Sequence, residues 1–489
     1  MEGERNVKKR VAAIVFCLAV LLGIGGKAGY DRWDNNTYIV IDGEKIRRDV
    51  TALDYAGKPL TELEKIKELS CLEKLDIRNT GLTVQQYEEL HAALPECDIL
   101  WQVPFQGNVL DSDTEFLPVT SLDETDVGML PYFRQLQKLD VTGCENYALL
   151  EGLKASRPEL DVHYTVRLGK RNYSCQTENL VLNNADPEQL AAVLPYLKNL
   201  TQVRFVGQTP DSEQIYQWKT AYPKVTFVWN FTVCGISTDS LETQLILSDT
   251  PIDHIEEVES ALKYFYNLER VEMCRCGIPS EELDALWKRN PEIRFVWEVQ
   301  MGRCVVRTDA TTFFPFRFGY DGNSVLRDSD MDEMKYCVDM ICVDLGHMHI
   351  SDYSFLNHMP NMQYLILADT RGTDFSPLAN LKELKYVELF MTGFDQAEVL
   401  VGLTKLEDVN LGTTRITNLE PLKQMTWLKH LWLPENRSVQ GPEKTALVEA
   451  LPDTVVNFYG PGSTGHGWRN IPNYYAMRDL LGMPYTPDN

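Results

Sequence analysis

The sequence predicts an α/β solenoid in which short strands stack into a parallel-sheet horseshoe with helical turns on its outer side. Two repeats carry this prediction. An apolar-x-apolar pair returns every 22 residues between 343 and 433, and a longer unit returns every 64 to 68 residues before it. One short strand with two inward aliphatic side chains cannot bury them alone, whereas stacked copies form a continuous core.

The 22-residue repeat keeps its register without an insertion. Its apolar pairs are Val343/Leu345, Leu365/Leu367, Val387/Leu389, Val409/Leu411 and Leu431/Leu433. The last four pairs lie within the pattern L-x-x-L-x-L-x-x-[TN], with a closing residue such as Thr392 or Asn436. We expect this Thr or Asn to hydrogen-bond the backbone of the bend. Proline in segments such as 374–378 should start a single helical or 3₁₀ turn on the outer side.

This pattern resembles the leucine-rich repeat, in the short form found in internalin-like, secreted proteins of Gram-positive bacteria. The resemblance is strongest from 340 to 440 and continues in divergent form back to residue 50. It implies an array of 22-residue leucine-rich repeats over 339–460. The tail over 461–489 resembles the ending of secreted leucine-rich repeat proteins of Gram-positive gut bacteria.

The amino-terminal half repeats with a longer period. Aligning Leu75, Leu139, Val203 and Val271 gives steps of 64, 64 and 68 residues. The same alignment brings into register the aromatic residues Trp101, Tyr164, Trp229 and Trp297, and then Gly107, Gly169, Gly235 and Gly302. We therefore expect four divergent units over 50–302, each with two leucine-rich-repeat-like turns and an aromatic strand closed by glycine. The longer outer helices predict tighter curvature or protruding hairpins in this half.

Two segments interrupt or end the repeats. Residues 303–338 form a junction with the aromatic run from Phe313 to Phe318. We expect these rings to pack between the two arrays, because large apolar side chains are usually buried. An exposed aromatic patch for a partner is the alternative. The tail over 461–489, with Trp468 and Tyr474 among apolar residues at helical spacing, is expected to cap the open end of the last repeat.

The amino terminus predicts export. A basic tail over 1–10 precedes an apolar run that extends from 11 to 30, and a linker over 31–49 follows. The sixteen uncharged residues from Val11 to Gly26 are short of the roughly 20 that span a bilayer, although Lys27 can snorkel. Two interpretations stay open: a single-pass membrane anchor helix with a cytoplasmic amino terminus, or a cleaved signal peptide and secretion. Both place the repeats outside the cell.

The net charge limits the class of partner that the protein can bind. The chain has 47 basic and 71 acidic residues, a net charge of −24. Such a field repels nucleic acid and anionic lipid, and it favours basic partners or serves solubility alone.

The chain has eleven cysteines but no cysteine-rich cap at either end of the repeats. Several of these cysteines fall within predicted strands, so we expect free, buried thiols.

No catalytic or cofactor motif stands out from the sequence. The segment from Gly460 to Gly465 has Pro461 where a nucleophile elbow needs glycine, and we interpret it as a loop. His347, His349 and His358 lie close in sequence but do not define a ligand face. There is no phosphate-binding loop and no dinucleotide fingerprint. We therefore expect no enzyme activity, no metal and no cofactor.

The repeat predicts a surface instead. Side chains alternate along a strand, so the residues beside each inward aliphatic point to the concave face and stack into columns. We expect a binding face there, rich in aromatic and acidic groups. Its predicted members are Tyr364, Ile366, Tyr386, Glu388, Phe390, Asp408, Asn410, His430 and Trp432. The alternative is that exposed strand positions simply tolerate such residues.

These patterns favour a non-enzymatic cell-surface module for protein binding or adhesion, with a protein or peptide ligand, preferably a basic one. A structural spacer of the cell envelope without a soluble ligand is the alternative.

Overall fold

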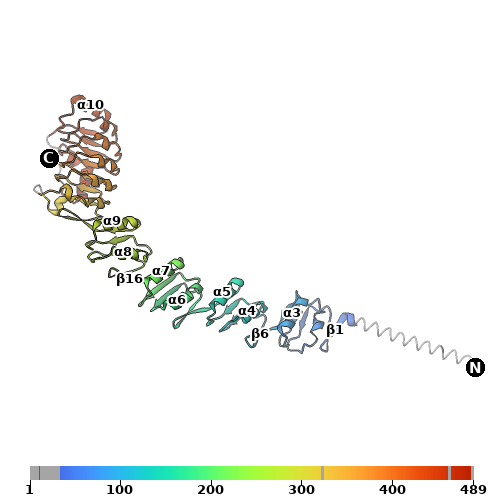
Figure 1. The fold of residues 1–489 in the computed structure, drawn as a ribbon. Helices are drawn as coiled ribbons and strands as arrows, with labels where there is room; N and C mark the ends of the chain where they lie inside the picture. Colours follow the sequence, from blue (N-terminus) through green and yellow to red (C-terminus); the bar gives the residue numbers. More distant parts are fainter. Residues whose placement is uncertain (1–9, 11–33, 321–323, 461–463, 486–489) are drawn as a thin grey trace, which may run out of the picture. The chain divides into compact units, whose positions relative to one another are not determined.

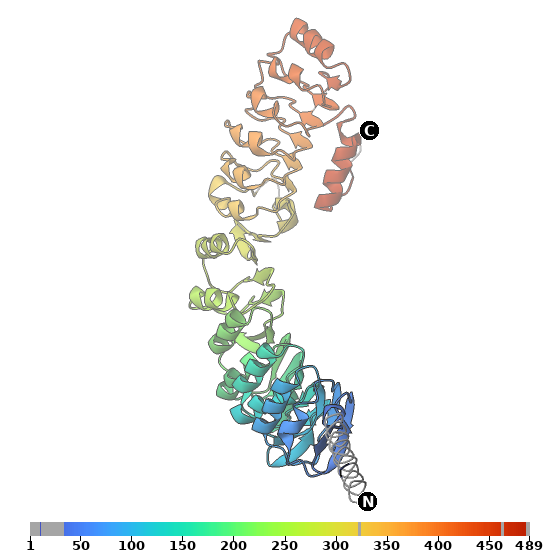
Figure 2. The same cartoon turned by 90° about the vertical axis from the view of Figure 1, so that its right-hand side faces the viewer.

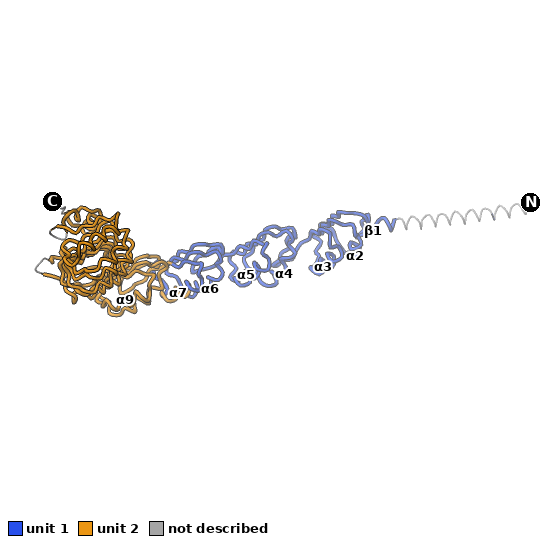
Figure 3. The backbone as a smooth tube through the Cα atoms, turned by 90° about the horizontal axis from the view of Figure 1, so that it is seen from above, with its two compact units in different colours: residues 1–211, 218–227 blue, residues 212–217, 228–489 orange. Residues whose placement is uncertain are grey.

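The computed structural model describes residues 10, 34–320, 324–460 and 464–485 (Figure 1). The apolar run over 11–30 and residues 461–463 lie outside this range, so the expected anchor or signal segment is not among the described residues. Among the described residues, no helix is long and apolar enough to cross a membrane. The chain forms two compact units (Figure 3). One comprises residues up to 211 with 218–227, and the other 212–217 with 228–489.

The long repeats alternate a three-stranded parallel sheet with a two-stranded antiparallel hairpin. The first repeats contain β1 (Tyr38–Ile41), β2 (Glu44–Arg47), β3 (Ala52–Asp54), α2 (Leu63–Ile66), β4 (Lys74–Asp76), α3 (Val84–Ala93), β5 (Asp98–Leu100), β6 (Gln102–Phe105), β7 (Asn108–Asp111), β8 (Phe116–Pro118), α4 (Glu124–Met129), η1 (Leu130–Tyr132), β9 (Lys138–Asp140), α5 (Tyr147–Ser156), β10 (Asp161–His163), β11 (Thr165–Leu168) and β12 (Arg171–Ser174). Strand order within each sheet follows the chain, as stacking of strand and helix turns requires.

The same design continues through the next two repeats. Their elements are β13 (Asn179–Asn183), α6 (Pro187–Val193), η2 (Leu194–Tyr196), β14 (Gln202–Val206), α7 (Ser212–Ala221), β15 (Thr226–Val228), β16 (Asn230–Val233), β17 (Ile236–Asp239), β18 (Gln244–Ile246), α8 (Ile255–Leu262), β19 (Arg270–Glu272), α9 (Ser280–Arg289), β20 (Arg294–Val296), β21 (Glu298–Met301) and β22 (Cys304–Arg307). Within the described residues, four three-stranded sheets are thus each followed by a two-stranded hairpin. Gly107, Gly169, Gly235 and Gly302 lie in the hairpin turns with positive φ.

A buried aromatic residue joins each sheet to its hairpin. The backbone N–H of Trp101, Trp229 and Trp297 donates to the hydroxyl of the residue eleven positions later, at 3.0, 3.3 and 3.1 Å. The indole nitrogens of Trp229 and Trp297 also donate to Ser212 and Ser280, at 3.0 and 3.2 Å. These paired bonds fix the aromatic ring against the first turn of the preceding helix.

The first repeat lacks one of these bonds. Val84 stands seventeen residues before Trp101, where the third and fourth repeats have Ser212 and Ser280, and the Trp101 indole nitrogen is buried without an acceptor among the described residues. Replacing Val84 by Ser should raise the free energy of unfolding of this repeat by about 1 kcal/mol, because a buried donor gains an acceptor. Chemical denaturation followed by tryptophan fluorescence measures the change. Val84→Ala is the matched control, and equal stability of both variants would contradict the prediction.

The short array is a seven-stranded parallel sheet. Its strands are β23 (Thr312–Phe313), β24 (Cys342–Asp344), β25 (Tyr364–Ile366), β26 (Tyr386–Glu388), β27 (Asp408–Asn410), β28 (His430–Trp432) and β29 (Val455–Asn457). The outer elements are η4 (Asp328–Asp330), η5 (Met334–Tyr336), η6 (Ser354–His358), η7 (Ser376–Asn380), η8 (Ala397–Leu400), η9 (Pro421–Gln424) and α10 (Gly441–Ala450). Short 3₁₀ turns opposite short parallel strands every 22 residues define a leucine-rich repeat architecture.

The core and the bends of the short array follow the predicted register. The inward aliphatics, such as Val387, Leu389 and Leu411, are fully buried. The Thr392 hydroxyl donates to the Leu389 carbonyl, and the Asn436 amide donates to the Leu411 and Leu433 carbonyls at 2.7 and 3.3 Å. The closing residues therefore hydrogen-bond the backbone as expected. The residue before each of them is left-handed, at Asp369, Met391, Thr413 and Glu435, and His347 has the same conformation one repeat earlier.

The sheet begins earlier than the spacing suggests. β23 lies inside the segment 303–338 and pairs with β24, so the first strand precedes the 22-residue register. Phe313 is buried in this strand, Phe314 is partly buried, and Phe316 remains 36% exposed. The aromatic run therefore splits, with one ring in the core of the array and the next two toward the inner face of the sheet.

The carboxy-terminal segment does not cap the open end of the last repeat. Helix η10 (Trp468–Asn470) and helix α11 (Pro472–Leu481) pack on the inner face of the sheet instead. Helix α11 contacts β23 and β24, the first two strands, at the end of the sheet opposite the last repeat. The expected cap is wrong in its location. The reason is the polar and aromatic composition of the inner face, which the segment covers.

The ten described cysteines are free thiols, and all but Cys71 and Cys234 are buried. Burial raises the pKa of Cys337 to about 12, so this thiol stays protonated and unreactive. The expected burial is therefore seen for eight of the ten described cysteines, and the expectation is wrong for Cys71 and Cys234.

Replacing Leu389 by Asp should unfold the short array, because an unpaired carboxylate at this fully buried position costs several kcal/mol, on the order of a domain's stability. Met391→Asp is the matched control in the same repeat, since Met391 is 48% exposed and left-handed, which Asp tolerates. Circular dichroism melting should show loss of the array in the first variant only. A normal melt for Leu389→Asp would contradict the register.

Candidate binding face of the short array

The strand register brings the predicted face residues together. Pairing of β24 through β28 aligns Tyr364, Tyr386, Asp408 and His430 in one column. A second column contains Ile366, Glu388, Asn410 and Trp432. Both columns are those that the 22-residue spacing predicts. The sequence thus identifies which side chains lie on one side of the sheet. We call this side the inner sheet face and define it as the two columns and Phe390.

The inner sheet face is not open to solvent. Of its nine residues, all except His430 are buried, and Tyr386 and Asn410 are completely inaccessible. The covering segment comes from the same chain, as Figure 2 shows for the carboxy-terminal helix beside the stacked repeats. Its buried side chains are Trp468, Ile471, Tyr474, Met477 and Leu481. The expectation of solvent-exposed strand side chains is therefore wrong, although the face does meet an aromatic peptide segment.

Trp468 makes the central contact with the face. Its indole nitrogen lies 2.9 Å from the Tyr386 hydroxyl oxygen and 2.8 Å from Glu388 Oε1. The ring stacks on Tyr386 with centroids 5.3 Å apart, and it lies at the same distance from the ring of Trp432. The Trp432 indole in turn donates to the Gly465 carbonyl at 3.1 Å. Aromatic area and hydrogen bonds therefore fix one residue against two strands.

Asn473 makes the second polar contact. Its amide donates to Asp408 Oδ2 at 2.8 Å and to Glu407 Oε2 at 3.0 Å. The other Asp408 oxygen lies 2.6 Å from His430 Nδ1. Asp408 is 1% exposed, so these partners satisfy a carboxylate that would otherwise be costly to bury. The hydrogen bonds set the orientation of the segment along the strands.

The local sequence explains the shape of the segment. Pro472 begins α11, where a missing N–H costs nothing, and left-handed Gly482 ends it. Tyr474, Met477 and Leu481 follow helical spacing and face the sheet. Arg317, from the aromatic run, donates to the Leu481 carbonyl at the end of the helix. The helix is therefore held at both ends.

Burial raises the pKa of Glu388, on the inner sheet face, and of Asp344, which pairs with Ile366 from the preceding strand. Burial raises the pKa of Glu388 above its usual range, and hydrogen bonds from Tyr386 and Trp468 oppose the rise. Burial also raises the pKa of Asp344 to about 7, with the nearby Glu388 charge adding to the rise. Arg469 and Arg478 act in the opposite direction on Glu388. The two acids therefore have raised pKa values and lie near the positive charges of the two arginines.

Asp344 should make the stability of the short array depend on pH. Its pKa is higher in the folded chain than the ordinary 3.8, so the folded state binds the proton more tightly and stability falls as pH rises from about 4 to about 7. Asp344→Asn removes this loss and can keep the acceptor for the Gly346 N–H. The variant's advantage in melting temperature should grow with pH up to about 7 and then level off. An advantage that is constant with pH would contradict the raised pKa.

The histidines near the start of the array do not converge. His347 Nδ1 lies 3.0 Å from Asp369 Oδ2, and His349 Nε2 lies 2.8 Å from an Arg371 nitrogen. His358 is exposed on η6. Among the residues that the structure describes, no three His, Cys, Asp or Glu side chains form a group that could hold a metal ion.

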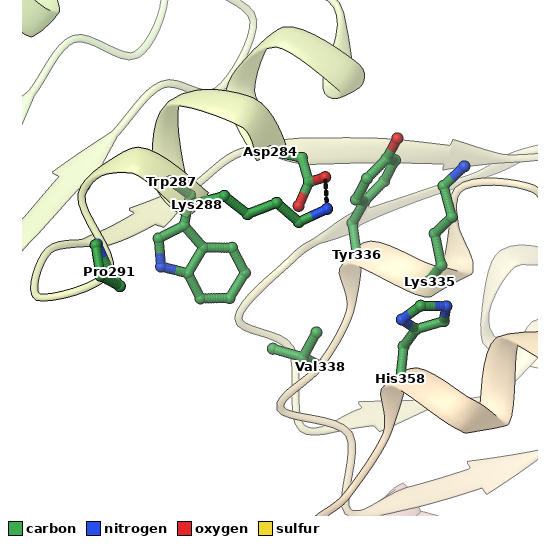
Figure 4. A pocket seen from close by; sticks show the side chains of 8 residues that line it. All are labelled: Asp284, Trp287, Lys288, Pro291, Lys335, Tyr336, Val338 and His358. Atoms are coloured by element: carbon green, nitrogen blue, oxygen red, sulfur yellow. Dashed lines mark hydrogen bonds and ion pairs between the residues drawn. The ribbon is translucent and has the colours of Figure 1, made fainter.

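The outer side carries a depression of about 610 Å³ between α9, η5 and η6, which the sequence did not indicate. Figure 4 shows its lining, with Lys288 paired to Asp284 at 2.6 Å and with Trp287, Tyr336 and His358 around the same space. Arg294 stacks on Trp287 at 4.2 Å. These residues come from separate repeats, so no local motif could reveal them.

The occupant of the inner face was the main feature missed from the sequence. The helical spacing of Trp468, Tyr474, Met477 and Leu481 indicated an amphipathic segment but not the surface that it covers. Glu388 and Asp408 were a usable signal for a covering segment with polar groups. Carboxylates in the middle of a column need hydrogen-bond donors if the column is covered.

Comparison with known proteins supplies neighbours in structure only. No protein-family model matches the sequence, and no curated protein matches it. The chain is similar to internalin C2 of Listeria monocytogenes, with 19% identity over 44% of this chain and 80% of that one and a TM-score of 0.25. It is also similar to internalin F of the same species, with 13% identity over 86% and 91% and a TM-score of 0.26. A leucine-rich repeat protein of Leptospira interrogans shows 16% identity over 84% and 90%, with a TM-score of 0.25.

These identities and TM-scores are low, and the assignment of a leucine-rich repeat architecture rests on the repeat geometry described above.

Proposed function

We propose that this protein is a non-enzymatic binding module that holds a protein or peptide ligand on the inner sheet face of its short array. The observation that carries the proposal is that this face already holds a peptide segment, residues 465–481 of the same chain. Trp468 and Asn473 make the polar contacts, and Tyr474, Met477 and Leu481 bury the apolar side of the helix. The chain's own segment then represents the kind of ligand that the face accepts.

The chemistry of the face favours a particular ligand class. Tyr386 and Trp432 offer flat aromatic area, and Glu388, Glu407 and Asp408 offer hydrogen-bond acceptors. Aromatic anchors beside acceptors suit a short amphipathic helix with a tryptophan and an amide or basic group. The net charge of −24 favours a basic partner over an acidic one. In this proposal the chain's own segment leaves the inner sheet face when the partner binds.

The proposal includes a location outside the cell. The basic tail and the apolar run at the amino terminus support either a membrane anchor or secretion after signal cleavage, and both expose the repeats. A cell-surface or secreted module with a protein ligand fits this arrangement.

One observation favours a second candidate function. Trp468 is fully inaccessible and its indole nitrogen has two acceptors, as expected for a permanent part of the core. If the segment never leaves, the inner face has no room for a partner and the array serves as a structural spacer of the cell envelope.

A peptide exchange experiment separates the two functions. A synthetic peptide with the sequence of residues 464–485 is labelled and titrated against the full chain and against the Trp468→Ala, Asn473→Ala double variant, whose own segment is held less tightly. The binding proposal predicts saturable binding to the variant, with an affinity at least tenfold higher than for the full chain. A peptide carrying the same two alanines is the matched control and should bind at least tenfold more weakly.

Retention of the repeats in the double variant is checked by its far-UV circular dichroism. If the folded variant binds neither peptide, the inner face does not exchange its occupant, and the spacer function replaces the binding function.

A further inference from the structure

A cavity of about 310 Å³ remains between the inner sheet face and the carboxy-terminal segment. Its charged lining comes from both sides, with Asp344 and Glu388 on β24 and β26 and with Arg469 and Arg478 on the segment. This volume lies at the lower end of the range for small-molecule sites. The cavity exists only while the segment is in place, so it is distinct from the peptide-binding role proposed above.

Each of the two acids has one oxygen engaged by the protein. Asp344 Oδ1 accepts the Gly346 N–H at 2.8 Å, and Glu388 Oε1 accepts from Trp468 and Tyr386. Within residues 34–320, 324–460 and 464–485, no donor bonds Asp344 Oδ2 or Glu388 Oε2. Glu388 is 5% exposed as a residue and lines the cavity, so its second oxygen is available to a group held there. A cationic group with several N–H donors would satisfy both carboxylates.

The two arginines provide the opposite charge. Arg478 gives its Nε and one terminal nitrogen to the Pro484 carbonyl, which leaves its other terminal nitrogen uncommitted. Arg469 has no hydrogen-bond acceptor in the part of the chain that the structure describes. Both charges act on Glu388 across the cavity. A carboxylate group would match the planar donor arrangement of a guanidinium.

The remaining lining is apolar. Phe390 and Ile366 come from the sheet, Met477 and Met483 come from the segment, and Phe314 comes from the aromatic run. Aromatic and thioether side chains adapt to apolar groups of different shape. Two formal negative charges face two formal positive charges, so a simple anion or cation would leave the groups of one sign without a partner.

We propose that this cavity binds a small zwitterion with an apolar side chain, of the free α-amino acid class. The ligand's ammonium group lies between Asp344 and Glu388, its carboxylate meets Arg469 and Arg478, and its side chain contacts Phe390 and Met477. Bound ligand adds contacts that join the segment to the sheet, and it therefore stabilises the covered state of the inner face.

Isothermal titration of the full chain near pH 7 tests the site, with L-phenylalanine, L-leucine and L-methionine as probes. At least one of them should bind saturably at one site per chain. Two truncated analogues test the two charges: phenethylamine lacks the carboxylate, and 3-phenylpropionate lacks the ammonium group. Each should bind at least tenfold more weakly than phenylalanine. An analogue that binds as tightly as the amino acid would overturn the zwitterion assignment, as would the absence of saturable binding for all three probes.

Variants of the full chain locate the site. Arg469→Gln and Asp344→Asn should each weaken binding of the best probe at least tenfold while the melting curve keeps its cooperative shape. Arg415→Gln is the matched control, because Arg415 is exposed and does not line the cavity. Unchanged affinity in both lining variants would overturn the proposal. This outcome is distinguishable from failure of the peptide experiment, which concerns release of the segment.

Discussion

The burial of Glu388 and Asp408 in the middle of a sheet face is the constraint on which the carboxy-terminal half depends. A carboxylate without partners costs several kcal/mol to bury, so each one needs donors that the sheet alone does not supply. Trp468 and Asn473 provide them from the covering segment. Tyr386, on the same strand as Glu388, and His430, on the strand next to Asp408, complete the set. The segment and the inner face therefore form one core, and the array has apolar packing on both sides of its sheet.

This arrangement shapes both proposed roles. A face that hydrogen-bonds a helix through a tryptophan and an amide is selective, because a ligand without these groups leaves buried acceptors unpaired. A partner must therefore match the chain's own segment in order to replace it. The cavity beside the segment has the opposite requirement, since it needs the segment in place. A small zwitterion and a peptide partner would thus favour different states of the same surface.

The repeat spacing predicted the architecture and the composition of the inner face, because strand alternation and stacking are local properties of the sequence. It located Tyr386, Glu388 and Trp432 on shared columns and Thr392 at its bend. It could not show what covers them, since the helical spacing of Trp468 to Leu481 is compatible with any apolar surface. The first strand, at Thr312 and Phe313, was missed because the inserted turns at 315–336 place it out of the 22-residue register. The absent bond of Trp101 was visible only in three dimensions, when Val84 was seen in the position of Ser212 and Ser280.

Amide hydrogen exchange of the full chain, resolved at the level of single segments, tests the central claim most directly. The claim predicts that amides in α11 exchange far more slowly than those of an unpacked helix, because the segment is packed on the inner sheet face in the free chain. A ten-residue helix that did not pack on the sheet would be marginal in water and would exchange quickly. Rapid exchange in α11 beside a protected β26 would contradict the account.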